Sequence, residues 1–338
     1  MGHDRGRVYN KIYSRQEYEL VNPFNKHLLE DFLEEYKQRK IKPSTILQYE
    51  NDLRIILVHI KNNFENRSIL ELTKKDFRKI SLWLTEDLKL SNARVNRMLS
   101  VIRSLLSYAE DDDEYDYDNN VARKVKGLPK EPVKTNEDDF YLSFDQVMRL
   151  REELIRRGKL QQAVLLMLMF DSGGRRYEIY QVKKTGLLNG NKTNVVIGKR
   201  GKVFSLIYLN DTKELIRQYL EQRGDDDIES LWINVDANGN KKTVTSQTIY
   251  EWVVQMSNIL SELEGKTIKF FPHSLRHSRI ECLLQGTDTR IIDPATGKPR
   301  KFTLQECQLF AHHEDPKTTQ GYTKNHADEI IDNMFNFS

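Results

Sequence analysis

Two short segments in the C-terminal third of the chain concentrate histidine, arginine and tyrosine. Residues 272–277 are Pro-His-Ser-Leu-Arg-His, and residues 311–322 are Ala-His-His-Glu-Asp-Pro-Lys-Thr-Thr-Gln-Gly-Tyr. A tyrosine hydroxyl is a weak nucleophile at neutral pH, because its pKa is about 10. It becomes effective where a cationic site holds the target and stabilises the charge that develops on it. These residue types therefore indicate attack of Tyr322 on a phosphate.

The first of these segments has helical spacing. His273 and Arg276 are three residues apart and share a face of a helix, and His277 lies near the same face. Leu275 points away from that face, toward a core. Two other interpretations remain open: a helix-capping histidine beside a surface arginine, or a metal site at His273 and His277. The metal site is disfavoured because the glutamate of an HExxH motif is absent.

Two further segments carry cations after turn-forming glycines. Arg175 follows Gly173 and Gly174 at the end of an apolar run, and Lys199 lies in the turn Gly-Lys-Arg-Gly of residues 198–201. Taken singly, these segments are typical of a helix C-cap followed by surface arginines, and of a solvent-exposed hairpin tip. A lysine on such a turn can also reach into a site and donate a proton to a leaving oxygen.

In their order along the chain, four segments resemble the motifs of the tyrosine recombinase (phage integrase) family. They are Gly-Gly-Arg-Arg-Tyr-Glu at 173–178, Gly-Lys-Arg-Gly-Lys at 198–202, His-Ser-Leu-Arg-His-Ser at 273–278 and His-His-Glu-Asp-Pro-Lys-Thr-Thr-Gln-Gly-Tyr at 312–322. Their joint order and spacing are far more specific than any one segment. The resemblance covers the second half of the chain by motif and the first half by its helical layout alone.

The resemblance implies a catalytic set, carried over position by position: Arg175 with the acidic Glu178 after it, Lys199, His273, Arg276, His313 and the nucleophile Tyr322. His313 rather than His312 matches the family's histidine, because it keeps the nine-residue distance to Tyr322. The two arginines would bind non-bridging phosphate oxygens through paired donors, and Lys199 would protonate the departing 5′-oxygen. A covalent 3′-phosphotyrosine retains the bond energy, so the resemblance implies strand cutting and rejoining without a metal, ATP or other cofactor.

The chain departs from the family's pattern at two places. Gly174 stands before Arg175, where the family usually has a bulky apolar residue. Additional residues near 287–301 separate the His-x-x-Arg box from His313, and residues 293–298 among them predict a loop. We expect this loop to influence assembly or the choice of target.

The elements that position these side chains follow from hydrophobic periodicity. After an N-terminal arm at residues 1–20, residues 21–118 predict a helical domain, since apolar residues recur at helical spacing in four segments. Capping residues precede three of these segments, at Ser44 or Thr45, at Thr73 and at Ser91. The resemblance implies that this region is the all-helical, SAM-like core DNA-binding domain of the family.

A linker is expected at residues 119–139, which contain two prolines and mixed charge, and a catalytic domain at residues 140–338. The nearly continuous apolar segment 161–170 predicts a buried helix. Residues 194–197 and 203–209 predict a β-hairpin, and most of the remaining chain is expected to be helical. The predicted fold class is mainly α with a small β-sheet, with a mixed α+β tyrosine-recombinase catalytic domain after the helical one.

Basic residues are concentrated locally. The formal net charge is only +3, so charge alone does not identify a nucleic-acid partner. Candidates for DNA contact are Arg94, Arg97 and Arg103 on the fourth predicted helix, and Arg200 and Lys202 in the hairpin turn. A solvated basic face is the alternative interpretation for the helix.

Composition excludes several classes of protein. Cys282 and Cys307 form no CxxC or Cys/His pattern, which disfavours a disulfide framework or a zinc site and favours a reducing compartment. The polar N-terminus lacks the apolar core of a signal peptide. The longest apolar run, residues 163–170, is too short to cross a bilayer. We therefore expect a cytoplasmic protein with no membrane partner, and the resemblance implies a bacterial or phage-infected cell.

The function implied by the resemblance is site-specific recombination or integration of double-stranded DNA, as carried out by mobile elements. The chain is expected to act as a homo-oligomer, a dimer to a tetramer on DNA, with its apolar C-terminal tail packed on a neighbouring subunit. Two alternatives remain open. One is a DNA-binding transcriptional regulator, a repressor with the recombinase fold but no strand exchange. The other is a type IB topoisomerase, which shares the tyrosine chemistry.

Overall fold

The computed structural model describes residues 12–129 and 141–312. The chain divides into two compact units, Met1–Pro132 and Val133–Ser338, and each is described by itself. His313 and Tyr322, two members of the predicted catalytic set, lie outside the described residues.

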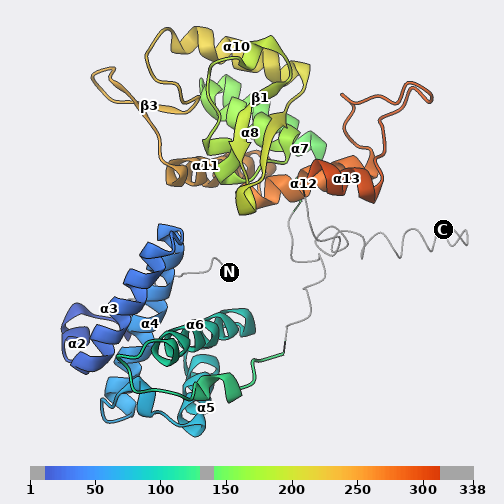
Figure 1. The fold of residues 1–338 in the computed structure, drawn as a ribbon. Coiled ribbons are helices and arrows are strands. Elements are labelled where there is room, and N and C mark those ends of the chain that lie inside the picture. The colour runs from blue at the N-terminus through green and yellow to red at the C-terminus, as the bar shows by residue number, and fades with distance from the viewer. Residues whose placement is uncertain (1–11, 130–140, 313–338) are drawn as a thin grey trace, which may run out of the picture. The chain divides into compact units, whose positions relative to one another are not determined.

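The first unit is a group of helices around one apolar core (Figure 1). Its elements are α2 (Arg15–Glu19), α3 (Pro23–Gln38), α4 (Pro43–Asn63), a 3-10 turn (Ile69–Glu71), α5 (Lys74–Leu82), a π turn (Trp83–Asp87), α6 (Asn92–Asp111) and a second 3-10 turn (Val121–Lys124). Thr73 and Asp76 form a capping box at the start of α5, and Ser91 caps α6. The four predicted helices are confirmed. The cap predicted at Ser44 or Thr45 is wrong, because α4 begins at Pro43, a residue suited to the first helical position.

Two stretches that were predicted to lie outside the helical domain pack against it. Within the predicted arm, Ser14 caps α2, and Arg54 lies over the rings of Tyr13 and Tyr18, 5.5 and 5.2 Å from their centroids. At the start of the predicted linker, Ala122 and Val125 are buried in the core. A five-residue helix and a single turn are too short to produce a periodic pattern, so the sequence did not reveal them.

The second unit is built around α8 (Leu160–Ser172), in which every residue from Ala163 to Ser172 is buried. The apolar segment therefore forms the predicted buried helix. Helices α7 (Phe144–Arg156), α10 (Asn210–Arg223) and α12 (Pro272–Gln285) pack on it, and Figure 1 shows α8 between α10 and α12. The other helices are α9 (Arg176–Tyr180), α11 (Ser246–Glu264) and α13 (Leu304–Phe310), with 3-10 turns at Leu187–Asn189 and Lys199–Gly201.

Two antiparallel hairpins complete this unit within the described residues. The predicted one is confirmed as β1 (Lys192–Ile197) paired with β2 (Val203–Ile207), in a register that places Val196 opposite Phe204. The second, β3 (Ile233–Val235) paired with β4 (Lys241–Thr243), was not predicted. Its strands have three residues each, and β4 carries two lysines, so neither strand shows a clear apolar alternation.

The segment between α12 and α13 is not helical, although most of this region was predicted to be. It forms a loop whose tip is closed by a hydrogen bond from the Asp293 N–H to the Lys298 carbonyl at 2.9 Å. An isolated bridge joins Ile292 to Pro299 below the tip. The loop predicted at residues 293–298 is thus confirmed.

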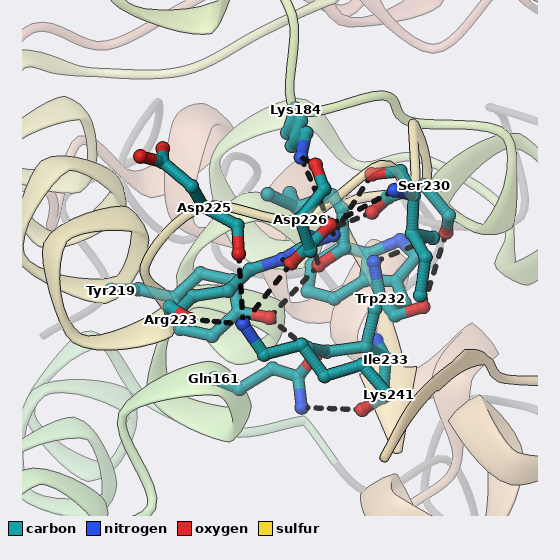
Figure 2. Close-up of polar contacts among 12 residues, drawn as sticks. Gln161, Lys184, Tyr219, Arg223, Asp225, Asp226, Ser230, Trp232, Ile233 and Lys241 are labelled. Carbon is teal, nitrogen blue, oxygen red and sulfur yellow. Dashed lines mark hydrogen bonds and ion pairs between the residues drawn. The ribbon is translucent and has the colours of Figure 1, made fainter. Parts of the chain in front are cut away.

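A buried guanidinium holds the chain between α10 and β3 (Figure 2). The side chain of Arg223 is fully buried and forms two bonds to Asp226, at 2.7 and 2.6 Å. It also donates to the carbonyls of Ile228, Ser230 and Leu231. Lys184 and Lys241 lie on the same carboxylate, 2.9 and 3.5 Å away. The bonds from Arg223, followed by those from Lys184, hold the pKa of Asp226 far below its ordinary value.

We predict that Asp226→Asn lowers the free energy of unfolding by about 3 kcal/mol, because it leaves the guanidinium of Arg223 buried without its carboxylate. Urea denaturation measures the change. The matched control is Glu229→Gln, which removes the exposed pair with Lys183 and should have a much smaller effect. Equal effects of the two substitutions would contradict the prediction.

Candidate active site

Arg175 follows a tight turn at the end of α8. Gly173 ends the helix with a φ of 57°, a left-handed conformation that favours glycine. Space is tight at Gly174, since a Cβ there would lie 3.0 Å from Ile179 and 3.2 Å from Leu206, and these side chains would have to shift by a few tenths of an ångström. The glycine therefore suits the local packing at a position where the family usually has a bulky residue.

Glu178 holds Arg175 in place from the first turn of α9. The Arg175 backbone N–H donates to one carboxylate oxygen at 2.7 Å, and its Nη1 donates to the other at 3.0 Å. Glu178 is buried, with 3% of its side chain exposed, whereas 31% of the Arg175 side chain is exposed. The carboxylate therefore orients a guanidinium that still reaches the surface.

The β1–β2 hairpin approaches the same carboxylate at Gly198, the residue before Lys199. A Cβ on Gly198 would lie 3.2 Å from Glu178 Oε1 and 2.7 Å from the ring of Phe204, so only glycine fits there without displacing a neighbour. Gln181 of the α9 C-terminus fixes the strand end, donating to the Ile197 carbonyl and accepting from its N–H. Lys199 comes directly after Gly198 and is exposed.

Arg276 links three segments that are distant in sequence. Its residue exposure is 2%, so the interpretation as a surface arginine is wrong. Its Nη1 donates to the Gly173 carbonyl at 2.6 Å, and its Nη2 donates to the Ala311 carbonyl. Gly173 is two residues before Arg175, and Ala311 is two residues before His313. The buried guanidinium therefore joins the Arg175 turn to the end of α13.

The histidines lie around this arginine. His273 lies in the first turn of α12, three residues before Arg276, and is exposed. Its ring centroid is 4.3 Å from that of His277. Leu275 is fully buried, as predicted. His312 stacks on Phe204 of the hairpin, with ring centroids 4.0 Å apart.

His312 is near several charged groups of the site. Desolvation lowers its pKa; nearby Glu178 opposes this shift, while Arg276, Lys202 and Arg175 add to it. His312 was set aside in favour of His313 on spacing, and the structure places it against the hairpin. The ring of Phe204, which makes this contact, was not singled out in the sequence because an apolar strand residue carries no chemical signal.

The basic residues proposed for DNA contact have different surroundings. Arg94 and Arg97 pair with the buried Asp52 at 2.7 and 3.1 Å, and Arg103 donates to the carbonyls of Ala122 and Val125. These three side chains therefore also support the fold of the first unit. Arg200 and Lys202 are exposed in the hairpin turn, beside Lys199.

Across residues 12–129 and 141–312, no cluster of three or more histidine, cysteine, aspartate or glutamate side chains is arranged to hold a metal ion. Over the same ranges, no helix combines the length and apolarity that a membrane span requires.

Comparison with known proteins identifies the family. The phage integrase N-terminal SAM-like domain matches residues 29–112, and the phage integrase family domain matches residues 141–298. Together the two matches cover well over half of the chain. The chain belongs to the phage integrase family, the tyrosine recombinases, and the predicted fold class is confirmed.

Individual relatives agree with this assignment. The chain is 27% identical to the SPbeta prophage-derived recombinase-like protein YomM of Bacillus subtilis (strain 168), over 89% of this chain and 87% of that protein. It is 26% identical to tyrosine recombinase XerC of Treponema denticola, over 86% of this chain and 92% of that protein. The crystal structure of the XerH site-specific recombinase bound to palindromic difH substrate, a post-cleavage complex, has the same fold. Its TM-score is 0.63 at 17% identity, over 97% of this chain and 94% of that one.

We predict that Gly198→Ala lowers the free energy of unfolding by about 1 to 3 kcal/mol, since the added methyl group overlaps Phe204 and Glu178. Chemical denaturation of the purified chain measures this loss. Gly190→Ala is the control, because a Cβ at Gly190 meets no atom within 4 Å. If Gly198→Ala is as stable as Gly190→Ala, the hairpin turn is not held against Glu178.

Proposed function

We propose that the chain is a site-specific recombinase that cuts and rejoins double-stranded DNA through a 3′-phosphotyrosine at Tyr322. Membership of the phage integrase family supports this activity. The observation that carries the proposal is the bond from Arg276 to the Gly173 carbonyl, because it holds Arg276 next to the turn that presents Arg175. Nothing in the family match or in the named relatives favours the repressor alternative.

In the proposed reaction, Arg175 and Arg276 bind the non-bridging oxygens of the scissile phosphate. Their fixed positive charges stabilise the extra negative charge of the five-coordinate transition state, without a metal ion. The geometry supports these roles, since Glu178 fixes Arg175 and two backbone carbonyls fix Arg276. A preorganised pair of this kind loses little energy to rearrangement when the charge develops.

The proton transfers are assigned to the remaining members of the set. The Tyr322 oxygen attacks phosphorus and loses its proton with the help of His273 and His313. The bond to the 5′-oxygen breaks, and Lys199 donates a proton to that oxygen. The exposed position of Lys199 on the hairpin turn suits a donor that must reach into bound DNA. One phosphodiester is exchanged for another, so rejoining needs no ATP.

We further propose that the chain acts as a dimer to a tetramer on DNA. A palindromic site offers the same half-site twice, which suits two symmetry-related protein copies. The palindromic substrate in the XerH complex supports this arrangement for the present chain.

The proposal is tested with suicide substrates, duplexes nicked beside the cleavage position so that the cut strand cannot be rejoined. Candidate duplexes come from the DNA that flanks the gene. We predict a covalent protein–DNA adduct for the wild type and none for Tyr322→Phe, with DNA binding retained, because only the nucleophilic oxygen is removed. Denaturing gels measure the adduct. Tyr177→Phe is the control, since Tyr177 is a 60% exposed tyrosine next to Arg176 and should leave the adduct intact.

Other outcomes would favour the alternatives. Tight, sequence-specific binding by the wild type without an adduct would support a regulator. Relaxation of a supercoiled plasmid that lacks the site would support a type IB topoisomerase. An adduct that survives in Tyr322→Phe would remove Tyr322 from its assigned role.

Arg200 and Lys202 are predicted to contact DNA phosphates. Each alanine substitution should reduce the slope of log K against log salt concentration by about one unit, because one fewer counterion is released on binding. Fluorescence anisotropy across a salt series measures the slope. Arg217→Ala is the control, because Arg217 lies on α10 in an exposed pair with Glu214. Unchanged slopes in the Arg200 and Lys202 variants would place the hairpin turn outside the DNA interface.

A further inference from the structure

The loop between α12 and α13 places Arg290 among three carboxylates. Its Nη2 donates to Asp171 at 2.7 Å and to Asp288 at 2.8 Å, and its Nε donates to Asp288 at 2.9 Å. Its Nη1 lies 3.0 Å from the carboxylate of Asp211. The guanidinium also lies over the ring of Phe144, and 15% of the side chain is exposed. Arg290 therefore bridges α7, α8 and the start of α10.

Asp171 connects Arg290 to the Arg175 turn. It lies in the last turn of α8 and is 1% exposed. One carboxylate oxygen accepts from Arg290, and the other accepts from the Leu209 N–H at 2.9 Å and the Thr212 hydroxyl at 2.6 Å. Two residues later, the Gly173 carbonyl accepts from Arg276. The position of Asp171 therefore sets the position of the turn.

Asp288 connects Arg290 to α12. Its Oδ2 accepts from Arg279 Nη1 at 2.5 Å, and both side chains are almost fully buried. Arg279 lies on α12 one turn after Arg276, and its guanidinium covers the ring of Phe170 on α8. The chain of contacts from Asp171 through Arg290 and Asp288 to Arg279 thus begins beside Arg175 and ends beside Arg276.

We propose that Arg290 is a positioning residue for recombination: by bridging Asp171 and Asp288 it fixes the distance between the α8 turn and α12, and thereby between Arg175 and Arg276. The expected effect on cleavage rests on the proposed function, whereas the structural role of Arg290 rests on the observed bridge alone. A guanidinium spreads five donors over a planar fork and reaches three separate carboxylates from different nitrogens, whereas the three donors of a lysine share a single nitrogen. The loop between α12 and α13 thus supplies a brace for the two arginines proposed to bind phosphate.

The test uses Arg290→Lys, which keeps the charge and loses the fork, together with Arg290→Gln. With the nicked DNA duplexes, we expect the single-turnover cleavage rate at saturating DNA to fall by about 10- to 100-fold, as displacements near one ångström do in active sites. The dissociation constant for DNA should stay close to the wild-type value, because Arg290 is not assigned to DNA contact. Arg300→Gln is the matched control, since Arg300 lies in the same loop in an exposed pair with Glu306.

A second control separates positioning from stability. Asp226→Asn removes a buried ion pair elsewhere in the same unit, and it should lower the melting temperature without lowering the cleavage rate at saturating DNA. If Arg290→Lys remains folded and cleaves at the wild-type rate, the proposal is overturned. The same holds if its rate falls only as far as that of Asp226→Asn.

Hydrogen–deuterium exchange of the DNA-free protein tests the brace without any reaction. Peptides that cover residues 168–176 and 272–280 should exchange faster in Arg290→Lys than in the wild type. In Arg300→Gln their exchange rates should equal those of the wild type. If the wild type forms no adduct, the proposed function fails, but the exchange measurement still shows whether Arg290 holds the α8 turn and α12 in place. Identical exchange in the wild type and Arg290→Lys would overturn the brace even where cleavage is intact.

Discussion

The candidate site depends on the hydrogen bonds of the Arg276 guanidinium. The guanidinium is buried, and an arginine in the interior is tolerated only where its donors find acceptors. Two of those acceptors, the carbonyls of Gly173 and Ala311, are at the C-terminal ends of α8 and α13. Helix C-termini carry unsatisfied carbonyls and partial negative charge, which stabilise a cation. The bonds made by Nη1 and Nη2 of Arg276 therefore tie together the segment that carries Arg175 and the segment that precedes His313.

The second unit places other arginines inside the fold on the same principle. Arg223 and Arg279 are buried, and each pairs with an aspartate at hydrogen-bond distance. A buried ion pair contributes little net stability, but loss of one partner is costly, so such pairs fix geometry more than they add stability. In this unit, the Arg223–Asp226 pair holds the segment before β3, and the Arg279–Asp288 pair holds α12 to the loop that follows it. Rigid supports of this kind suit the proposed reaction, in which the fixed charges of Arg175 and Arg276 stabilise the transition state.

The first unit uses its basic residues differently. Arg94 and Arg97 share the buried Asp52. Burial raises the pKa of this carboxyl, and the two arginines oppose the shift only in part. Together, the two arginines on α6 and the aspartate on α4 carry a net charge of +1. The pairing therefore orders both side chains and still leaves positive charge near the surface, which is compatible with the proposed phosphate contacts.

The sequence by itself determined the local elements, and through the family resemblance it predicted the catalytic set. Periodicity predicted the long helices, the apolar run predicted α8, and the glycine-flanked turn predicted the first hairpin, because each of these elements is encoded by neighbouring residues. Short elements such as α2 and the β3–β4 hairpin were not predicted, since a few residues are too short to show hydrophobic periodicity. Only the tertiary structure decided that Arg276 is buried, that Glu178 meets the hairpin at Gly198, and that Arg290 joins Asp171 to Asp288. Those contacts join residues far apart in the chain, and their existence depends on how whole helices pack, which no local pattern specifies.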